Sequence, residues 1–68
     1  MTLCEAVERA AFELPFRWSI VLEVEQGAGC LELLDPSGTN IDGGPDAPDE
    51  SLADCVLRLI ARARVESE

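Results

Sequence analysis

Carboxylates are the most distinctive chemical groups of this chain, and they are concentrated in its middle. The 68 residues carry a formal charge of -9, from fourteen acidic and five basic residues. Residues 18–57 hold nine of the acidic residues and no Lys or Arg, so this segment accounts for the whole net charge. Negative charge of this density repels phosphate and attracts cationic surfaces. The sequence therefore argues against direct binding to nucleic acid or to an anionic membrane, and it favours a basic protein partner.

Catalysis by these carboxylates has little support. The chain contains no His, Tyr or Lys, so acid–base chemistry would rest on Asp and Glu alone, and a cysteine nucleophile would lack a histidine base. Catalytic carboxylates also need a buried site that raises their pKa, whereas these fall on faces that we expect to be exposed. We expect no enzymatic activity and no catalytic residue.

The segment DGGPDAPDE, residues 42–50, is the most acidic short stretch and invites comparison with a calcium loop. Such a loop reads D-x-[DN]-x-[DN]-G-x5-E, with Gly in the sixth position. Neither this segment nor DPSGTNIDGG, residues 35–44, has that spacing. Its glycines and prolines are typical of a connection between elements. We expect no metal site and no cofactor.

The three cysteines, Cys4, Cys30 and Cys55, have no C-x-x-C spacing. We expect them to be reduced and to act as small apolar residues, with an intermolecular disulfide or a reactive thiol as the alternatives. The first residues are amphipathic and acidic, and no apolar run has the length of a membrane span. These features predict a cytoplasmic protein.

Two amphipathic helices are expected near the ends of the chain. Thr2 and Glu5 have the spacing of a capping box, and the apolar stripe that follows ends at Pro15. The second helix begins at Asp49 or Ser51 and has an apolar stripe throughout. Three arginines lie towards its C-terminus, where the helix dipole favours cations: Arg58, Arg62 and Arg64.

A β-hairpin is expected after the first helix. Residues 18–25 alternate between apolar and polar types, which predicts a strand. The sequence QGAG predicts a turn at Gly27 and Ala28, with glycine supplying a positive φ. In that register Glu23 lies opposite Glu32 on the solvent face.

A second hairpin is expected at DPSG, which has the residues of a type I turn followed by a left-handed glycine. The third strand covers residues 39–42. This register places Leu33 opposite Ile41 on the inner face and Glu32 opposite Asp42 on the solvent face.

The predicted fold is α+β, with the order α-β-β-β-α in a single domain of residues 1–68. Both helices are expected to pack on one face of a three-stranded antiparallel sheet. The predicted core consists of Leu3, Val7, Ala10, Leu14, Trp18, Ile20, Leu22, Val24, Leu31, Leu33, Ile41, Leu52, Val56, Leu59 and Ile60.

The opposite face of the sheet, together with the acidic connection, is the predicted site for a partner. Its charged members are Glu23, Glu25, Glu32, Asp42, Asp46, Asp49 and Glu50. On the same face, Val21 and Leu34 are the predicted apolar anchors. Closely spaced carboxylates resemble the phosphates of DNA, which carry one charge per ~1.7 Å of duplex axis. The alternative is an acidic face that serves solubility alone.

Three resemblances bear on function. The element order and length are similar to a double-stranded RNA-binding domain, but PDESLAD stands where those domains have a basic cluster, so RNA binding is not implied. Residues 18–63, with strands followed by DESLADCVLRLIARA, resemble the HicB-type antitoxin domain, from which the leading helix departs. In size, acidity and lack of enzyme motifs, the chain resembles small phage-encoded inhibitors of bacterial defence of the anti-CRISPR type. That resemblance implies a stoichiometric inhibitor that docks on an Arg/Lys-rich groove of a host complex.

We therefore expect a small acidic inhibitor that binds a basic, nucleic-acid-binding surface of a partner as a nucleic-acid mimic. The alternative is an antitoxin-like or scaffold subunit that acts through apolar contacts. Monomer and homodimer both remain open, the homodimer through the free edge of the third strand.

Overall fold

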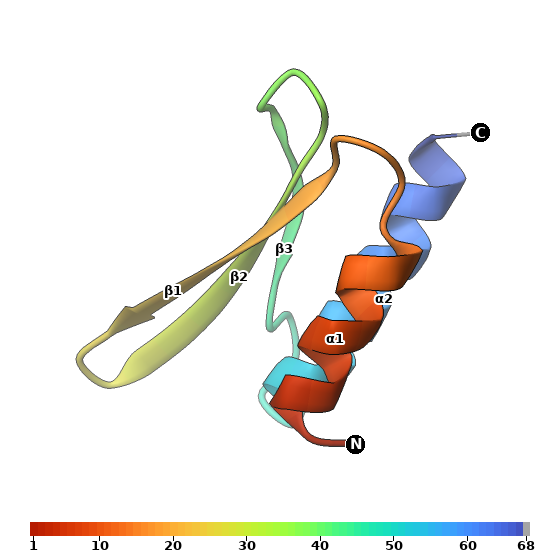
Figure 1. Ribbon diagram of the computed structural model, residues 1–68. Coiled ribbons are helices and arrows are strands. Elements are labelled where there is room, and N and C mark those ends of the chain that lie inside the picture. Colours follow the sequence, from red (N-terminus) through yellow and green to blue (C-terminus); the bar gives the residue numbers. More distant parts are fainter. Residues whose placement is uncertain (68) are drawn as a thin grey trace.

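The structure, a computed structural model, describes residues 1–67. Its elements are α1 (Leu3–Glu13), β1 (Ser19–Glu25), β2 (Ala28–Leu34), β3 (Asn40–Gly44) and α2 (Leu52–Glu66) (Figure 1). The strands form one antiparallel sheet in the order β1-β2-β3, and both helices lie on the same side of it. The predicted fold class is confirmed.

Both helices begin at the predicted cap residues. The hydroxyl of Thr2 accepts from the backbone N–H of Glu5 at 3.2 Å, and the Glu5 carboxylate accepts from the Thr2 N–H at 3.0 Å. This second hydrogen bond holds the pKa of Glu5 below its ordinary value. In α2, the hydroxyl of Ser51 accepts from the N–H of Asp54 at 3.1 Å. The chain leaves α1 in an extended conformation at Leu14, as expected for a residue that precedes proline.

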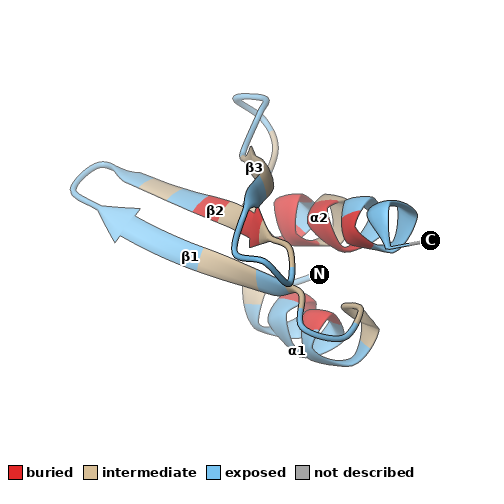
Figure 2. Ribbon diagram, turned by 90° about the horizontal axis from the view of Figure 1, so that it is seen from above, coloured by how far each residue is buried: buried red, intermediate tan, exposed pale blue. Residues whose placement is uncertain are grey.

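The core lies between α2 and the middle of the sheet. α2 packs against β2 and β3, whereas α1 packs mainly against α2. Figure 2 shows the buried residues gathered on α2, on β2 and on one side of α1. The large side chains that are fully enclosed include Leu33 of β2 and Leu59 of α2. Each such side chain contributes about 1.5–3 kcal/mol through burial.

The first hairpin turns at Gln26 and Gly27, one residue earlier than predicted. Gly27 has φ +85 at the second turn position, where a type II turn needs a left-handed residue. The strand register therefore differs from the predicted one by two residues. Because side chains alternate with period two, every side chain of β1 and β2 keeps its predicted face. The prediction that Glu23 lies opposite Glu32 is wrong, and Glu23 lies opposite Cys30 instead.

The second hairpin has the predicted turn chemistry. One carboxylate oxygen of Asp35 accepts from the backbone N–H groups of Ser37 and Thr39 at 3.0 and 2.9 Å. Gly38 takes the left-handed conformation with φ +89. The hydrogen bonds to Asp35, led by the one from the Ser37 side chain, hold the pKa of that carboxyl below its ordinary value.

A β-bulge then changes the register between β2 and β3. Leu34 pairs with Asn40, but Leu33 pairs with Asp42, which leaves Ile41 as the additional residue. The predicted pairing of Leu33 with Ile41 is therefore wrong. So is the predicted position of Asp42 on the solvent face, because the bulge turns its side chain towards α2.

The predicted core is also too large. Val7, Leu22 and Val24 are exposed by 52%, 45% and 76%. The β1–β2 hairpin projects past the helices, so α1 does not cover the inner face of its outer half (Figure 1). α1 is held against α2 through the small residues Ala6 and Ala10, and it leaves the inner face of β1 partly open. No helix among residues 1–67 combines the length and the apolar character that crossing a bilayer requires.

Candidate functional site

The residues predicted to bind a partner fall into two separate groups. Three glutamates lie on the face of the sheet that points away from α2: Glu23, Glu25 and Glu32. Three other acidic residues are joined to arginines of α2: Asp42, Asp46 and Glu50. The remaining predicted residue, Asp49, is exposed in the connection before α2. The sheet thus carries one acidic face without arginine partners and one ion-pair cluster.

Three glutamates surround Cys30 on the outer face. Alternation along β2 places Cys30 and Glu32 on the same side, and Glu23 lies directly across from Cys30. The pKa of the Cys30 thiol is raised, first by its loss of hydration and then by the charges of Glu23, Glu32 and Glu25. Glu23 is opposite the thiol, Glu32 is two residues along the same strand and Glu25 is on the diagonal, so the three carboxylates concentrate negative charge at one place on the sheet. We call these three glutamates the outer acidic face.

The carboxylates of the outer acidic face are not paired directly with one another. Glu32 lies opposite Val21, and Glu25 lies opposite Ala28. Glu23 and Glu32 are diagonal neighbours, whose separation in a sheet is about 7–8 Å. No two carboxylates of the outer acidic face share a cross-strand pair, so the repulsion of directly opposed charges is avoided, while the density of negative charge remains.

Apolar side chains border the outer acidic face. Val21 and Leu34 alternate onto this face and are half-buried. Their position beside the glutamates is the one predicted for apolar anchors. An apolar residue beside exposed charge is a typical feature of a specific contact surface.

Arg58 binds the second group of acids. Its guanidinium donates from Nη1 to Asp42 at 3.0 Å and from Nε to Glu50 at 3.0 Å, and it lies 3.4 Å from Asp46. Nη2 also donates to the backbone carbonyl of Gly43 at 2.8 Å. This arrangement ties the acidic connection and β3 to α2. We call these residues the Arg58 cluster.

The Arg58 cluster depends on two glycines. A side chain at Gly44 would collide with the guanidinium of Arg58 and with Cys55, and one at Gly43 would meet the carbonyl of Leu31. The lack of a side chain at Gly44 lets α2 approach β3 closely. The hydrogen bond from Arg58 holds the pKa of Glu50 below its ordinary value, and that same bond raises the pKa of Arg58.

The sequence alone does not reveal the Arg58 cluster. The arginines of α2 fit a favourable interaction with the helix dipole, and this interpretation leaves the acids of the connection free. Arg62 also approaches Asp42, at 3.8 Å, so two arginines offset most of the charge of three carboxylates. The signal that could have revealed the cluster is the spacing of Arg58 and Arg62 by one helical turn, directly after an acidic loop.

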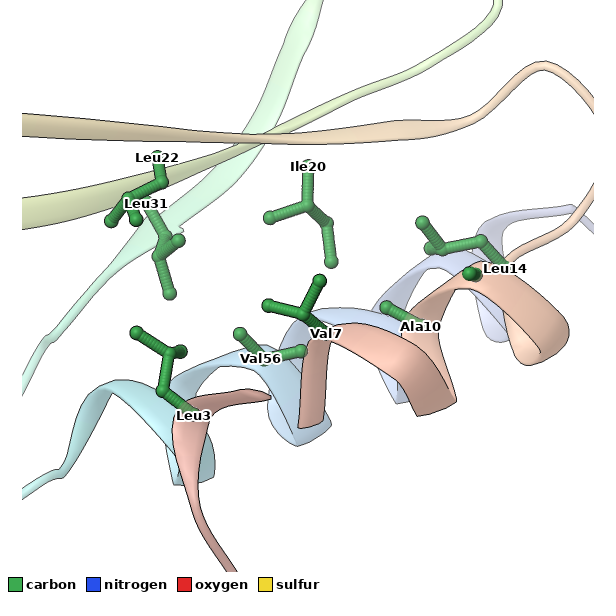
Figure 3. Close-up of a pocket in the computed structure, with 9 residues that line it drawn as sticks. Leu3, Val7, Ala10, Leu14, Ile20, Leu22, Leu31 and Val56 are labelled. Atoms are coloured by element: carbon green, nitrogen blue, oxygen red, sulfur yellow. The ribbon is translucent and has the colours of Figure 1, made fainter. Parts of the chain in front are cut away.

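An open apolar groove is the second feature that sequence patterns did not predict. It has a volume of about 360 Å³ and lies between α1 and β1 (Figure 3). Side chains from both elements point into it, among them Val7 from α1 and Ile20 and Leu22 from β1. The alternating pattern of β1 correctly places Ile20 and Leu22 on the inner face of the sheet. It carries no information on whether a helix covers them.

Cys4 and Cys30 are exposed and Cys55 is buried, and all three are free thiols. In the described part of the chain, no three acidic or cysteine side chains are arranged to hold a metal ion. Comparison of the chain with protein-family models, with curated proteins and with solved structures finds no match. The outer acidic face and the apolar groove are therefore the features that bear on function.

Proposed function

We propose that this protein is a small acidic binding protein that docks its outer acidic face on a basic surface of a partner. The observation that carries the proposal is the isolation of three glutamates from the arginines of the chain. None of the ion pairs among residues 1–67 involves Glu23, Glu25 or Glu32. The Arg58 cluster shows that the chain does pair other acids with arginine.

Uncompensated charge on a small domain has an energetic cost. A chain of this size buries only about 60% of its unfolded surface, so its stability is marginal, and the self-repulsion of a net charge of -9 lowers it further. A partner that presents Lys or Arg would relieve this repulsion on binding and would be steered towards the face by its charge. Binding to a cationic surface thus accounts for a feature that folding alone disfavours.

The type of partner that fits best is a protein whose arginines and lysines normally hold nucleic acid. Such a surface is complementary to closely spaced negative charge, and occupying it would exclude the nucleic acid. The protein would then act as a stoichiometric inhibitor of the anti-CRISPR kind. The proposed contact residues are the three glutamates of the outer acidic face together with Val21 and Leu34.

The apolar groove favours a second candidate function, that of an antitoxin-like or scaffold subunit. Val7, Leu22 and Val24 expose apolar surface. Burying this surface against a partner would be favourable. Binding through this surface would depend little on salt. Binding through the outer acidic face would weaken as salt rises, because exposed charges are screened over about 10 Å at 0.1 M.

The test is affinity purification from the native host with three baits. The first is the wild-type protein, and the second replaces Glu23, Glu25 and Glu32 with Gln. The third is a control with the same change in net charge at distant exposed positions, Glu8→Gln, Asp54→Asn and Glu66→Gln. We expect a basic protein to be retained by the wild type and the control and to be lost by the second bait. Equal retention by all three baits would contradict the proposal.

A further inference from the structure

We propose that the free edge of β1, together with the apolar groove beside it, binds an extended segment of a partner as a fourth strand of the sheet. The segment would alternate between apolar residues, which enter the groove, and basic residues, which lie beside the outer acidic face. The basic half of this pattern rests on the proposed function, whereas the strand addition rests on the groove and the sheet edge.

The edge of β1 is available for pairing. β1 lies at one side of the sheet and pairs only with β2 among residues 1–67. It is seven residues long and regular, and all seven pair with β2 without interruption. A long regular edge strand is the usual template for strand addition.

The opposite edge of the sheet is less suitable. β3 is shorter, with five residues, and a bulge at Ile41 interrupts its register. A short, bulged strand is a typical protected edge. Of the two oligomeric states left open by the sequence, the homodimer through the edge of the third strand is therefore not favoured.

The helices leave room for a strand beside β1. α2 lies under β2 and β3, and α1 lies on the β1 side of the sheet (Figure 2). Neighbouring strands are about 4.8 Å apart, whereas packed helices are about 8–10 Å apart, so two helices can cover roughly four strands. This sheet has three strands, and a fourth strand beside β1 would lie above α1.

The inner face of that position is apolar. The groove is lined from the helix side by Leu3, Val7 and Leu14 and from the sheet side by Ile20 and Leu22 (Figure 3). Alternate side chains of an added strand would point into this space, where they would cover the exposed parts of Val7 and Leu22. Valine, isoleucine and leucine match the groove in chemistry and in strand propensity.

The outer face of the same position is acidic. Residues of an added strand that point away from α1 would lie beside the β1 side chains on that face, which include Glu23 and Glu25. Opposite charges in cross-strand pairs stabilise a sheet, so these positions favour Lys or Arg. A second copy of this chain is a poorer occupant, because each copy carries a charge of -9 and its β1 would bring the same glutamates.

The experiment uses three synthetic peptides as long as β1. The first alternates Lys and Val. The second has the same composition, with the lysines and valines in separate blocks. The third has the alternating sequence with every backbone nitrogen methylated, which removes the backbone donors from both edges while the charges are kept. Affinities are measured by fluorescence anisotropy, and amide exchange of β1 is followed by NMR.

We expect the alternating peptide to bind at least about tenfold more tightly than the block peptide and to protect β1 amides that are otherwise free to exchange. Methylation of the whole backbone should abolish this preference. The protein variant Val7→Ser/Leu22→Ser should lose it as well, because both side chains line the groove. Both are about half exposed in the free protein, so we expect the variant to fold. Unfolding curves of the variant would check that it is folded.

The outcomes separate the two proposals. Equal binding of the alternating and block peptides, or no binding of either, would overturn the strand addition. The role of the outer acidic face would still be tested separately by the affinity purification. A preference for the alternating peptide that neither salt nor Glu23→Gln/Glu25→Gln changes would support strand addition and contradict the role of charge. A dimer in sedimentation equilibrium that Val7→Ser/Leu22→Ser dissociates would show that a second copy is the occupant, which also overturns the proposal.

Discussion

The guanidinium of Arg58 on α2 lies 3.0 Å from the carboxylate of Asp42 on β3. This contact marks the division between the two groups of acidic residues. On the inner side of the sheet, acids are hydrogen-bonded to arginine and hold the connection before α2 in place. On the outer side, three glutamates have no arginine within reach among residues 1–67.

Replacing Arg58 should destabilise the fold. Arg58→Met removes the arginine donors from the half-buried carboxylates of Asp42 and Glu50, and we expect a loss of about 1–2 kcal/mol, since solvent reaches part of the cluster. The control is Arg9→Met, which removes the same charge from an exposed pair with Glu13 and should change stability by less than about 0.5 kcal/mol. Urea unfolding followed by circular dichroism measures both. Equal effects of the two variants would mean that the Arg58 cluster has no special role.

Acid should weaken the protein in a defined range. The pKa of Glu50 is lowered in the folded state by its hydrogen bond from Arg58, and those of Glu5 and Asp35 are lowered by their own hydrogen bonds. A carboxyl whose pKa is lowered in the folded state stabilises the protein. This stabilisation is complete at pH values above the ordinary pKa, which is 4.5 for Glu and 3.8 for Asp. That stability is lost as the pH falls through the folded pKa.

The urea midpoint should therefore change little between about pH 7 and pH 5 on account of these groups and should fall below about pH 4.5. Glu50→Gln lowers stability at neutral pH and should make the decrease in acid shallower. If the midpoint of Glu50→Gln falls in acid as steeply as that of the wild type, Glu50 does not contribute to the pH dependence of stability.

Cys30 should report the charge of the outer acidic face. In a Cys4→Ser background, Cys30 is the exposed thiol that remains. Removing two nearby charges with Glu23→Gln and Glu32→Gln should lower the pKa of Cys30 towards its ordinary value of 9.0, although the contribution of lost hydration would remain. The rate of alkylation by iodoacetamide as a function of pH gives this pKa. The matched control is Glu8→Gln with Glu66→Gln. An equal shift of the Cys30 pKa in the control variant would mean that Glu23 and Glu32 do not lie close to the thiol.

Two leucines of the predicted core should respond very differently to truncation. Leu33 is fully buried, so Leu33→Ala should cost about 2–5 kcal/mol, a large share of the stability of so small a domain. Leu22 is 45% exposed on the rim of the groove, so Leu22→Ala should cost less than about 1 kcal/mol. Chemical unfolding of both variants gives the comparison, and similar losses would mean that β1 is covered.

The sequence predicts the elements of this fold well because their signals are local. The capping box of Thr2, the turn at Asp35 and the apolar stripe of α2 each depend on residues a few positions apart. Face assignment in the first hairpin is also robust, since the actual turn shifts the register by two residues and keeps Glu23 and Glu32 on the outer side.

Long-range relationships were not predictable in the same way. The bulge at Ile41 reverses the side of Asp42, and nothing in the local pattern distinguishes a bulged strand from a regular one. The partners of Arg58 are between eight and sixteen residues away along the chain. The open groove arises because α1 packs on α2 through Ala6 and Ala10, a choice that helical periodicity does not specify.

The most direct test of the central claim is the affinity of the purified partner for the protein at two salt concentrations. Calorimetry would compare the wild type with the variant in which Glu23, Glu25 and Glu32 are all Gln, at about 0.1 M and about 1 M salt, where the screening length falls from about 10 Å to about 3 Å. We predict that the variant binds at least about tenfold more weakly at low salt and that the difference largely disappears at high salt. Equal affinities of the two proteins at low salt would contradict the assignment of the outer acidic face as the docking surface.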